Sequence, residues 1–302
     1  MLPPGRNFAP VPTKTLILAG DVVTKPVACC SELNQILVVP RRVVPVGFGA
    51  GVVEWMESTA LPSYNPPMSN LGDGISADNA SWTFAGVSDH FDTHVSRSVP
   101  FYHEGQDLIV RVADYFLLDD STCYDLGCST GTLLKRLAEH NQSKRIRFFG
   151  IDVEEGMVRK AADKCRGHAN IEVLQYDILE LELQKTDLVI LYYTMQFVRP
   201  RNRQMMFDRI YAALNWGGAL LCFEKVRGAD ARFQDILTGV YTEFKIEQGY
   251  TSEEMVAKTR SLKGVLEPFS TEGNLNLMKR AGFVDVMSVF KYACFEGFLA
   301  IK

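Results

Sequence analysis

A single turn, residues 124–131 with the sequence YDLGCSTG, constrains the fold of this chain more than any other feature. An apolar strand leads into the turn, and a helix is expected over residues 133–140. Gly127 and Gly131 let the backbone approach a ligand at a distance that a Cβ atom would prevent. The next expected strand leads into Asp152, which can accept hydrogen bonds from both hydroxyls of a ribose. The pattern predicts a Rossmann-like α/β domain with a nucleoside site at the ends of its strands.

The acidic residue within this turn distinguishes the site from a dinucleotide site. Dinucleotide-binding turns carry G-x-G-x-x-G and direct a helix N-terminus at a pyrophosphate. Here Asp125 precedes the first glycine, and a carboxylate repels a pyrophosphate but attracts the ammonium group of an amino acid. A nucleoside with an amino-acid tail matches both ends of the site. We therefore expect S-adenosylmethionine as the cofactor.

The other expected strands follow in an order that fits the same fold. Residues 170–178 contain Asp177 near their end, a carboxylate placed to meet an adenine amino group. Residues 187–193 form an almost unbroken apolar run, as parallel strands buried on both faces do. Further strands are expected at residues 147–151, 219–224, 283–292 and 295–301. We predict a seven-stranded, mostly parallel sheet with an antiparallel C-terminal hairpin and a helical insertion, about residues 228–268, over the pocket.

Helical periodicity fills the gaps between these strands. Helices are expected at residues 84–95, 106–116, 229–250 and 270–281. The third of them carries apolar residues at spacings of three and four from Phe233 to Phe244, which is the stripe of an amphipathic helix. Its position after the fifth strand is where this fold commonly inserts helices over a substrate pocket.

The length, charge and cysteine content of the chain exclude several classes of protein. The chain has 302 residues, a net charge of −4 and 23% charged residues, so we expect no direct binding of nucleic acid. Its seven cysteines include no C-x-x-C pair, which argues against a zinc site and a disulfide framework and favours a reducing, cytoplasmic location. Because no apolar run is long enough to span a membrane, we expect no membrane partner, and we expect no bound metal.

Residues 1–67 differ in texture from the rest of the chain. Pro40, Pro45 and the glycine-rich run 47–51 interrupt any long element, so we expect a poorly structured extension or a few edge strands. Residues 68–302 are expected to form the cofactor-binding domain. We hypothesise that the functional chain begins at Met68. Recovery of peptides upstream of Met68 from the endogenous protein would refute this.

From Trp82 to the C-terminus the sequence resembles the carboxy-S-adenosyl-L-methionine synthase family, within the class I S-adenosylmethionine-dependent methyltransferase superfamily. The shared segments are Trp82-Thr83-Phe84, residues 97–100 with Tyr102, residues 124–129, Gln196-Phe197, residues 211–221, Glu224-Lys225, Phe244-Lys245, Gly249-Tyr250 and residues 281–283. The family makes the carboxylated cofactor used in tRNA wobble-uridine modification. The resemblance also implies a homodimer in which the segment around Arg260 reaches toward the neighbouring subunit.

The resemblance implies a set of cofactor contacts in this chain. They are Tyr102, Gly127, Cys128, Ser129, Asp152, Asp177 and Ile178. Asp125, Gly131, Val153 and Tyr192 complete our candidate cofactor residues.

Two departures from the family pattern bear on the chemistry. The family has an asparagine near the end of the fourth strand where this chain has Tyr192. In the family an arginine also binds the added carboxylate of the carboxylated cofactor. Its position is occupied here by Thr259, and Arg260 follows one residue later. One residue rotates a helical side chain by about 100°, so Arg260 does not simply inherit that role.

Three functions remain open from the sequence. The altered clamp slightly favours methyl transfer to a small-molecule acceptor, with the aromatic faces of Tyr192 and Tyr193 stabilising a sulfonium by roughly 0.5–2 kcal/mol. The first alternative is carboxyl transfer from a donor such as prephenate, giving carboxy-S-adenosylmethionine and phenylpyruvate. Arg97, Arg199 and Arg260 are the candidate cations for the product carboxylate, with Arg260 the best placed. The second alternative is a partner subunit that binds the cofactor without catalysis.

Overall fold

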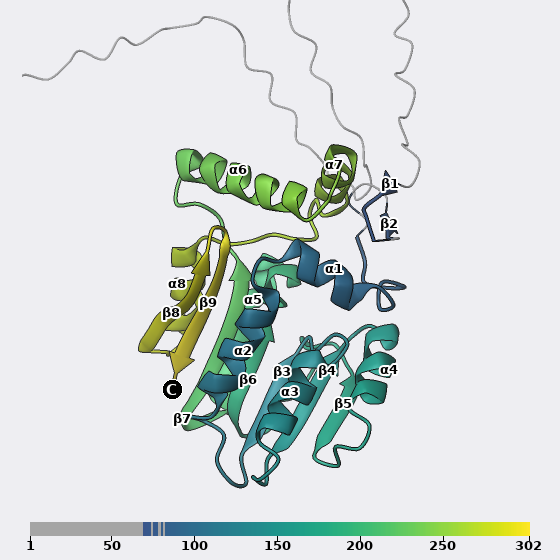
Figure 1. Cartoon of the computed structure of the whole chain (residues 1–302). Helices are drawn as coiled ribbons and strands as arrows, with labels where there is room; N and C mark the ends of the chain where they lie inside the picture. The colour runs from purple at the N-terminus through teal and green to yellow at the C-terminus, as the bar shows by residue number, and fades with distance from the viewer. Residues whose placement is uncertain (1–68, 74, 78–79, 81) are drawn as a thin grey trace, which may run out of the picture. The chain divides into compact units, whose positions relative to one another are not determined.

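The computed structural model describes residues 69–73, 75–77, 80 and 82–302, and its centre is a seven-stranded sheet (Figure 1). The strands are β3 (Thr122–Leu126), β4 (Arg147–Asp152), β5 (Ile171–Gln175), β6 (Thr186–Tyr192), β7 (Leu214–Lys225), β8 (Asp285–Tyr292) and β9 (Phe295–Ile301). Their order is β5-β4-β3-β6-β7-β9-β8, parallel from β5 to β7 and antiparallel at β9 and β8. The predicted sheet is confirmed. The expectations for residues 1–67 and for Met68 fall outside the described residues.

The strand order reverses between β3 and β6. The chain runs outward through β4 and β5 before it returns to the other side of β3. Every residue of β3 is buried, and so is every residue of β6 except Asp187, which accepts a hydrogen bond from the Thr122 backbone N–H at 2.9 Å. A crevice forms beyond the carboxyl ends of these two strands, the place where doubly wound sheets bind their ligands.

Helices cover both faces of the sheet (Figure 1). On one face α2 (Tyr102–Ala113) and α3 (Thr132–His140) pack with Leu188 and Ile190 of β6. On the other face α5 (Pro200–Ala213) and α8 (Thr271–Ala281) pack with Val189 and Leu191 of the same strand. Alternate side chains of one strand therefore enter opposite cores. α4 (Glu155–Lys164) contacts β4 and β5.

A separate group of elements lies at the end of the sheet toward which the parallel strands point (Figure 1). This group, which we call the roof, consists of α1 (Phe91–Ser98), α6 (Ala231–Glu247), α7 (Ser252–Ser261) and the antiparallel pair β1 (Ser69–Asn70) and β2 (Ser76–Ala77). Asp230 caps α6 by accepting from the Phe233 N–H at 3.0 Å, and Thr251 with Glu254 forms a capping box on α7. α6 and α7 are the predicted helical insertion.

The bounds of two predicted helices were wrong. The helix expected from residue 84 begins at Phe91, because residues 84–90 form turns in which Gly86 has a φ of 75°. The helix expected over residues 106–116 begins earlier, at Tyr102, and ends at Ala113. Across the described ranges, no helix combines the length and the apolar character needed to cross a membrane.

Candidate active site

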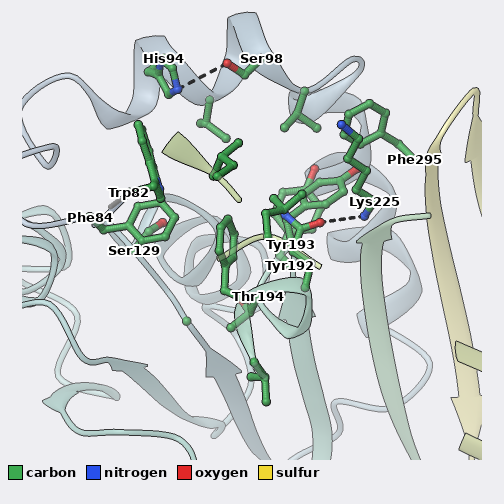
Figure 2. Close-up of a pocket in the computed structure, with 18 of the residues that line it drawn as sticks. Trp82, Phe84, His94, Ser98, Ser129, Tyr192, Tyr193, Thr194, Lys225 and Phe295 are labelled. Carbon is green, nitrogen blue, oxygen red and sulfur yellow. Dashed lines mark hydrogen bonds between the residues drawn. The ribbon is translucent and has the colours of Figure 1, made fainter. Parts of the chain in front are cut away.

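A cavity of about 780 Å³ lies between the carboxyl ends of the strands and the roof. Residues that follow β3, β4 and β6 line it from below, and residues of α1, α6 and α7 line it from above. Figure 2 shows Lys225 and Phe295 on one side of the cavity, Trp82 and Phe84 on the opposite side and His94 above. The volume is large enough for a nucleoside together with a second small molecule.

The glycine turn forms the floor of the cavity after β3. The backbone N–H groups of Gly127 and Cys128 both donate to the carbonyl oxygen of Ile151, at 2.7 and 3.0 Å. Gly127 has a φ of 81°, and a Cβ atom at this position would overlap the Thr194 side chain. Glycine is therefore required both by the backbone and by the space. Gly127 and Ser129 line the cavity.

Cys128 and Gly131, two candidate cofactor residues, do not line the cavity. Burial raises the pKa of the Cys128 thiol well above its usual value, so the group stays protonated. Gly131 has a φ of 74°, is the N-cap residue of α3 and packs against Ala161. Both residues therefore support the conformation of the turn and do not contact the cavity.

Asp152 is held at the end of β4 by two backbone donors. The Ser129 N–H donates to Oδ2 at 2.9 Å, and the Glu154 N–H donates to Oδ1 at 3.0 Å. Each oxygen keeps a second lone pair that a ribose hydroxyl could use. The other candidates near the expected nucleoside also line the cavity; these are Tyr102, Val153, Asp177 and Ile178.

Asp125 is the most unusual group of the site. Its side chain is 1% exposed and, like Cys128 and Gly131, it lies behind the cavity and does not line it; neither carboxylate oxygen has a hydrogen-bond partner among the described residues. Burial, followed by the charge of Asp152, raises the pKa of Asp125 to about 7. A buried carboxylate without a donor is costly, and an ammonium group brought into the crevice would offset that cost. The residues present therefore fit a nucleoside that carries an amino-acid tail.

The two tyrosines at the end of β6 have different environments, although both line the cavity. The Tyr192 hydroxyl donates to the carbonyl oxygen of Tyr102 and lies so close to Gly105 that a Cβ atom there would overlap it. Tyr193 has a φ of 62°, and its buried hydroxyl has no partner in the described part of the chain. A left-handed backbone at a residue other than glycine costs of order 1–3 kcal/mol and is common at functional sites. Tyr193 is thus the better placed of the two to meet a ligand.

Arg260, the candidate clamp, is exposed and does not line the cavity. Its carbonyl oxygen accepts from the Ala80 N–H at 2.9 Å, which ties the end of α7 to the segment before Trp82. Thr259 and Lys258 line the cavity instead. The expected rotation of one residue along the helix therefore separates Arg260 from the site.

Sequence reasoning missed three cavity-lining cations, Lys225, Lys245 and Lys258, which we call the lysine cluster. The distances from ammonium nitrogen to ring centre are 4.2 Å for Lys225 over Tyr241, 4.0 Å for Lys245 over Tyr250 and 4.1 Å for Lys258 over Trp82. None of the three lies within 4.0 Å of a carboxylate of the described residues. Burial lowers the pKa of all three, to about 8 for Lys245. They come from β7, α6 and α7, so no local spacing joins them in the sequence.

The sheet, the glycine turn, Asp152 at the end of β4 and Asp177 after β5 define an enzyme of the class I S-adenosylmethionine-dependent methyltransferase superfamily, whose cofactor is S-adenosyl-L-methionine. A family profile described as "Methyltransferase domain" matches residues 124–218. The structure of a putative O-methyltransferase from Nostoc punctiforme aligns with a TM-score of 0.52 at 15% identity, covering 72% of this chain and 59% of that one. This likeness supports the fold alone.

Two curated relatives identify the family. The carboxy-S-adenosyl-L-methionine synthase of Sulfurimonas denitrificans is 39% identical over 213 residues, which cover 70% of this chain and 90% of that protein. The synthase of the same name from Campylobacter jejuni is 37% identical over 217 residues, covering 72% and 92%. The chain belongs to the carboxy-S-adenosyl-L-methionine synthase family, and it is a transferase that depends on S-adenosylmethionine.

Proposed function

We propose that this chain is a carboxy-S-adenosylmethionine synthase and that the lysine cluster binds an anionic second substrate such as prephenate. The observation that carries the proposal is the presence of three cavity-lining ammonium groups without a carboxylate partner among the described residues. Ammonium groups in one low-dielectric cavity repel one another, and the charge of Lys225 contributes to the lowered pKa of Lys245. A ligand with carboxylates relieves this repulsion. The lysine cluster would therefore supply the positive charge for a carboxylate that Arg260 does not supply.

Different residues of the cavity would bind the cofactor and the second substrate. Gly127, Ser129 and Asp152 would hold the nucleoside, and Asp125 would attract the ammonium group of the cofactor. When bound, S-adenosylmethionine would supply a methyl carbon acidified by its sulfonium. That carbon would gain the ring carboxyl group of prephenate, released as CO2, and its proton would leave with the ring hydroxyl of prephenate as water, with phenylpyruvate as the other product. The lysine cluster would orient the carboxylates of prephenate, and the Tyr193 and Phe295 rings would exclude water.

Methyl transfer to an acidic small molecule is the second candidate. It is favoured by Tyr192, which occupies the position of the family asparagine, and by the exposure of Arg260. The lysine cluster would serve here too, as the site for the acceptor's acidic group. The two candidates therefore share one cavity and differ in their product.

Mass spectrometry of the nucleoside that co-purifies with the protein, with and without added prephenate, separates these candidates. We expect a carboxylated cofactor whose amount rises with prephenate. Unmodified S-adenosylmethionine or S-adenosylhomocysteine, unchanged by prephenate, would support methyl transfer. For variants of the lysine cluster in the same experiment, Lys263→Met is a suitable control, because Lys263 is exposed and lies outside the cavity.

We also propose that the chain forms a homodimer through α6. Phe233, Ile236 and Val240 follow each other at spacings of three and four, and their exposed fractions are 55%, 52% and 41%. An apolar stripe of this kind on a surface helix is typical of a contact between subunits. Light scattering coupled to gel filtration tests the proposal, and we expect Val240→Glu to yield a monomer.

We further propose a cytoplasmic location and no direct contact with nucleic acid. Cys123, Cys128, Cys165, Cys222 and Cys294 are all free and buried, as is usual for proteins of a reducing compartment. The net charge of −4 gives no attraction for a phosphate backbone. Fractionation of cells that express a tagged chain tests the location.

A further inference from the structure

Three segments of the roof meet at the carboxylate of Asp73. His94 Nδ1 lies 2.9 Å from Oδ2, the Tyr250 hydroxyl donates to the same oxygen at 2.9 Å, and the Arg97 guanidinium pairs with Oδ1. Burial opposes the ionisation of Asp73, but the hydrogen bonds from His94 and Tyr250 together with the neighbouring charge of Arg97 hold the pKa below its usual value. Asp73 is therefore an anion that can only accept hydrogen bonds.

This anion determines which nitrogen of His94 carries the proton. Because the Asp73 carboxylate accepts a hydrogen bond from Nδ1, the neutral imidazole of His94 has its proton on Nδ1 and a lone pair on Nε2. The ammonium group of Lys258 donates to Nε2, and the Ser98 hydroxyl lies 3.5 Å from the same nitrogen. Burial, followed by the charge of Lys258, lowers the pKa of His94 to about 4, which keeps the ring neutral near pH 7.

The geometry joins this chain of hydrogen bonds to the cavity. His94 and Lys258 both line the cavity, and His94 is only 4% exposed. Its ring stacks on Trp82 with centroids 6.0 Å apart, and the same indole lies beneath the Lys258 ammonium. Figure 2 shows His94 next to Ser98, above the space between Trp82 and Tyr193. Lys258 is thus held by one acceptor and one aromatic face, and it lines the cavity.

We propose that Asp73 and His94 are positioning residues that hold the Lys258 ammonium at the cavity surface and so set the affinity for a dicarboxylate second substrate. The inference rests on the proposed function, because it takes the lysine cluster as the site for that substrate. Asp73 precedes Trp82, where the resemblance to the family begins. The segment before Trp82 therefore contributes to the site through the roof.

The test measures binding of phenylmalonate, a stable aromatic dicarboxylate, by calorimetry on the full chain saturated with S-adenosylhomocysteine. We expect His94→Leu to weaken phenylmalonate binding about tenfold, as loss of one charge-assisted contact does. His94→Gln should stay within about threefold of the wild type, because its amide oxygen can accept from Lys258. In assays with prephenate, the same variants should change KM more than kcat.

A double-mutant cycle separates positioning from a merely structural role. The double variant His94→Leu with Lys258→Met should bind phenylmalonate no more weakly than Lys258→Met alone. Additive losses would overturn the inference, and so would a folded His94→Leu with unchanged affinity. Val87→Ala is the matched control, since Val87 is buried in the same core cluster as Trp82 but does not line the cavity. It should lower the melting temperature and leave the affinity for phenylmalonate unchanged.

The outcomes also distinguish this inference from the proposed function. If Lys258→Met, Lys245→Met and the wild type bind phenylmalonate equally, or if the wild type does not bind it, the anionic site fails and both are overturned. If Lys258→Met weakens binding and the His94 variants do not, only the positioning role fails. Should His94→Leu not fold, Asp73→Asn replaces it, with an expected loss of about threefold, and unchanged affinity in that variant would count against the inference.

Discussion

The floor and the roof of the cavity are built in opposite ways. The floor consists of the ends of neighbouring parallel strands and the short turns that follow them, where Gly127, Ser129 and Asp152 are fixed by backbone hydrogen bonds. The roof brings together Asp73, His94 and Lys258 from distant parts of the chain. The first arrangement suits a ligand shared by a whole superfamily, and the second can vary from member to member without disturbing the sheet. Cofactor and second substrate should therefore respond separately to substitution.

The largest expected effect is on the floor. Gly127→Ala places a Cβ at a φ of 81° and against Thr194, so the turn must shift. We expect the affinity for S-adenosylhomocysteine to fall about 100-fold, the equivalent of roughly 3 kcal/mol. Gly167→Ala is the matched control, because Gly167 has a φ of 97° but nothing within 4 Å of the added atom. Equal cofactor affinity in the two variants, measured by calorimetry, would contradict the role given to the turn.

The next effect is on the roof. Lys245→Met removes one cation from the lysine cluster while keeping the length of the side chain. We expect the KM for prephenate to rise about 30-fold, within the range for a charged hydrogen bond, with the affinity for S-adenosylhomocysteine unchanged. Lys263→Met should change neither quantity. A parallel loss of cofactor affinity in Lys245→Met would mean that floor and roof are not independent.

The two regions should also respond to pH in opposite directions. The pKa of Asp125 is raised to about 7 by burial and then by Asp152, and a cationic ligand favours the ionised form. Cofactor affinity should therefore fall by up to about tenfold per pH unit below pH 7, and Asp125→Asn should flatten this profile. The pKa of Lys245 is lowered to about 8 by burial and then by Lys225, so it loses its charge as pH rises. Affinity for phenylmalonate should fall above pH 8, and identical pH profiles for the two ligands would contradict this.

The smallest effect compares two neighbours on β6. Tyr192→Phe removes a hydrogen bond to the Tyr102 carbonyl and should cost about 1 kcal/mol of unfolding free energy. Tyr193→Phe removes a hydroxyl that has no partner among the described residues, so stability should be unchanged, while the KM for prephenate rises a few-fold. Chemical denaturation and steady-state kinetics on both variants measure this. Equal stability loss in the two variants would show that the Tyr193 hydroxyl is structural.

The sequence predicted the floor well because its information is local. Apolar runs, glycine turns and an acidic residue at a strand end are each short sequence patterns, so the mostly parallel sheet and the placing of Asp152 followed. Boundaries failed where one glycine changed the backbone, as at Gly86 before α1. The roof helices α6 and α7 were predicted, but the lysine cluster was not, because Lys225, Lys245 and Lys258 meet only in the folded chain. Arg260 was a candidate because it follows the position of the family arginine. It is exposed, because one residue further along α7 a side chain points in another direction.

One measurement tests the central claim most directly. Wild-type chain and Lys245→Met are incubated with S-adenosylmethionine and with prephenate labelled isotopically in its ring carboxylate, and the nucleoside products are analysed by mass spectrometry. We predict labelled carboxy-S-adenosylmethionine from the wild type and a much slower reaction from Lys245→Met at low prephenate. Unlabelled, unchanged S-adenosylmethionine from a wild-type protein that binds the cofactor would contradict the claim that this cavity transfers a carboxyl group.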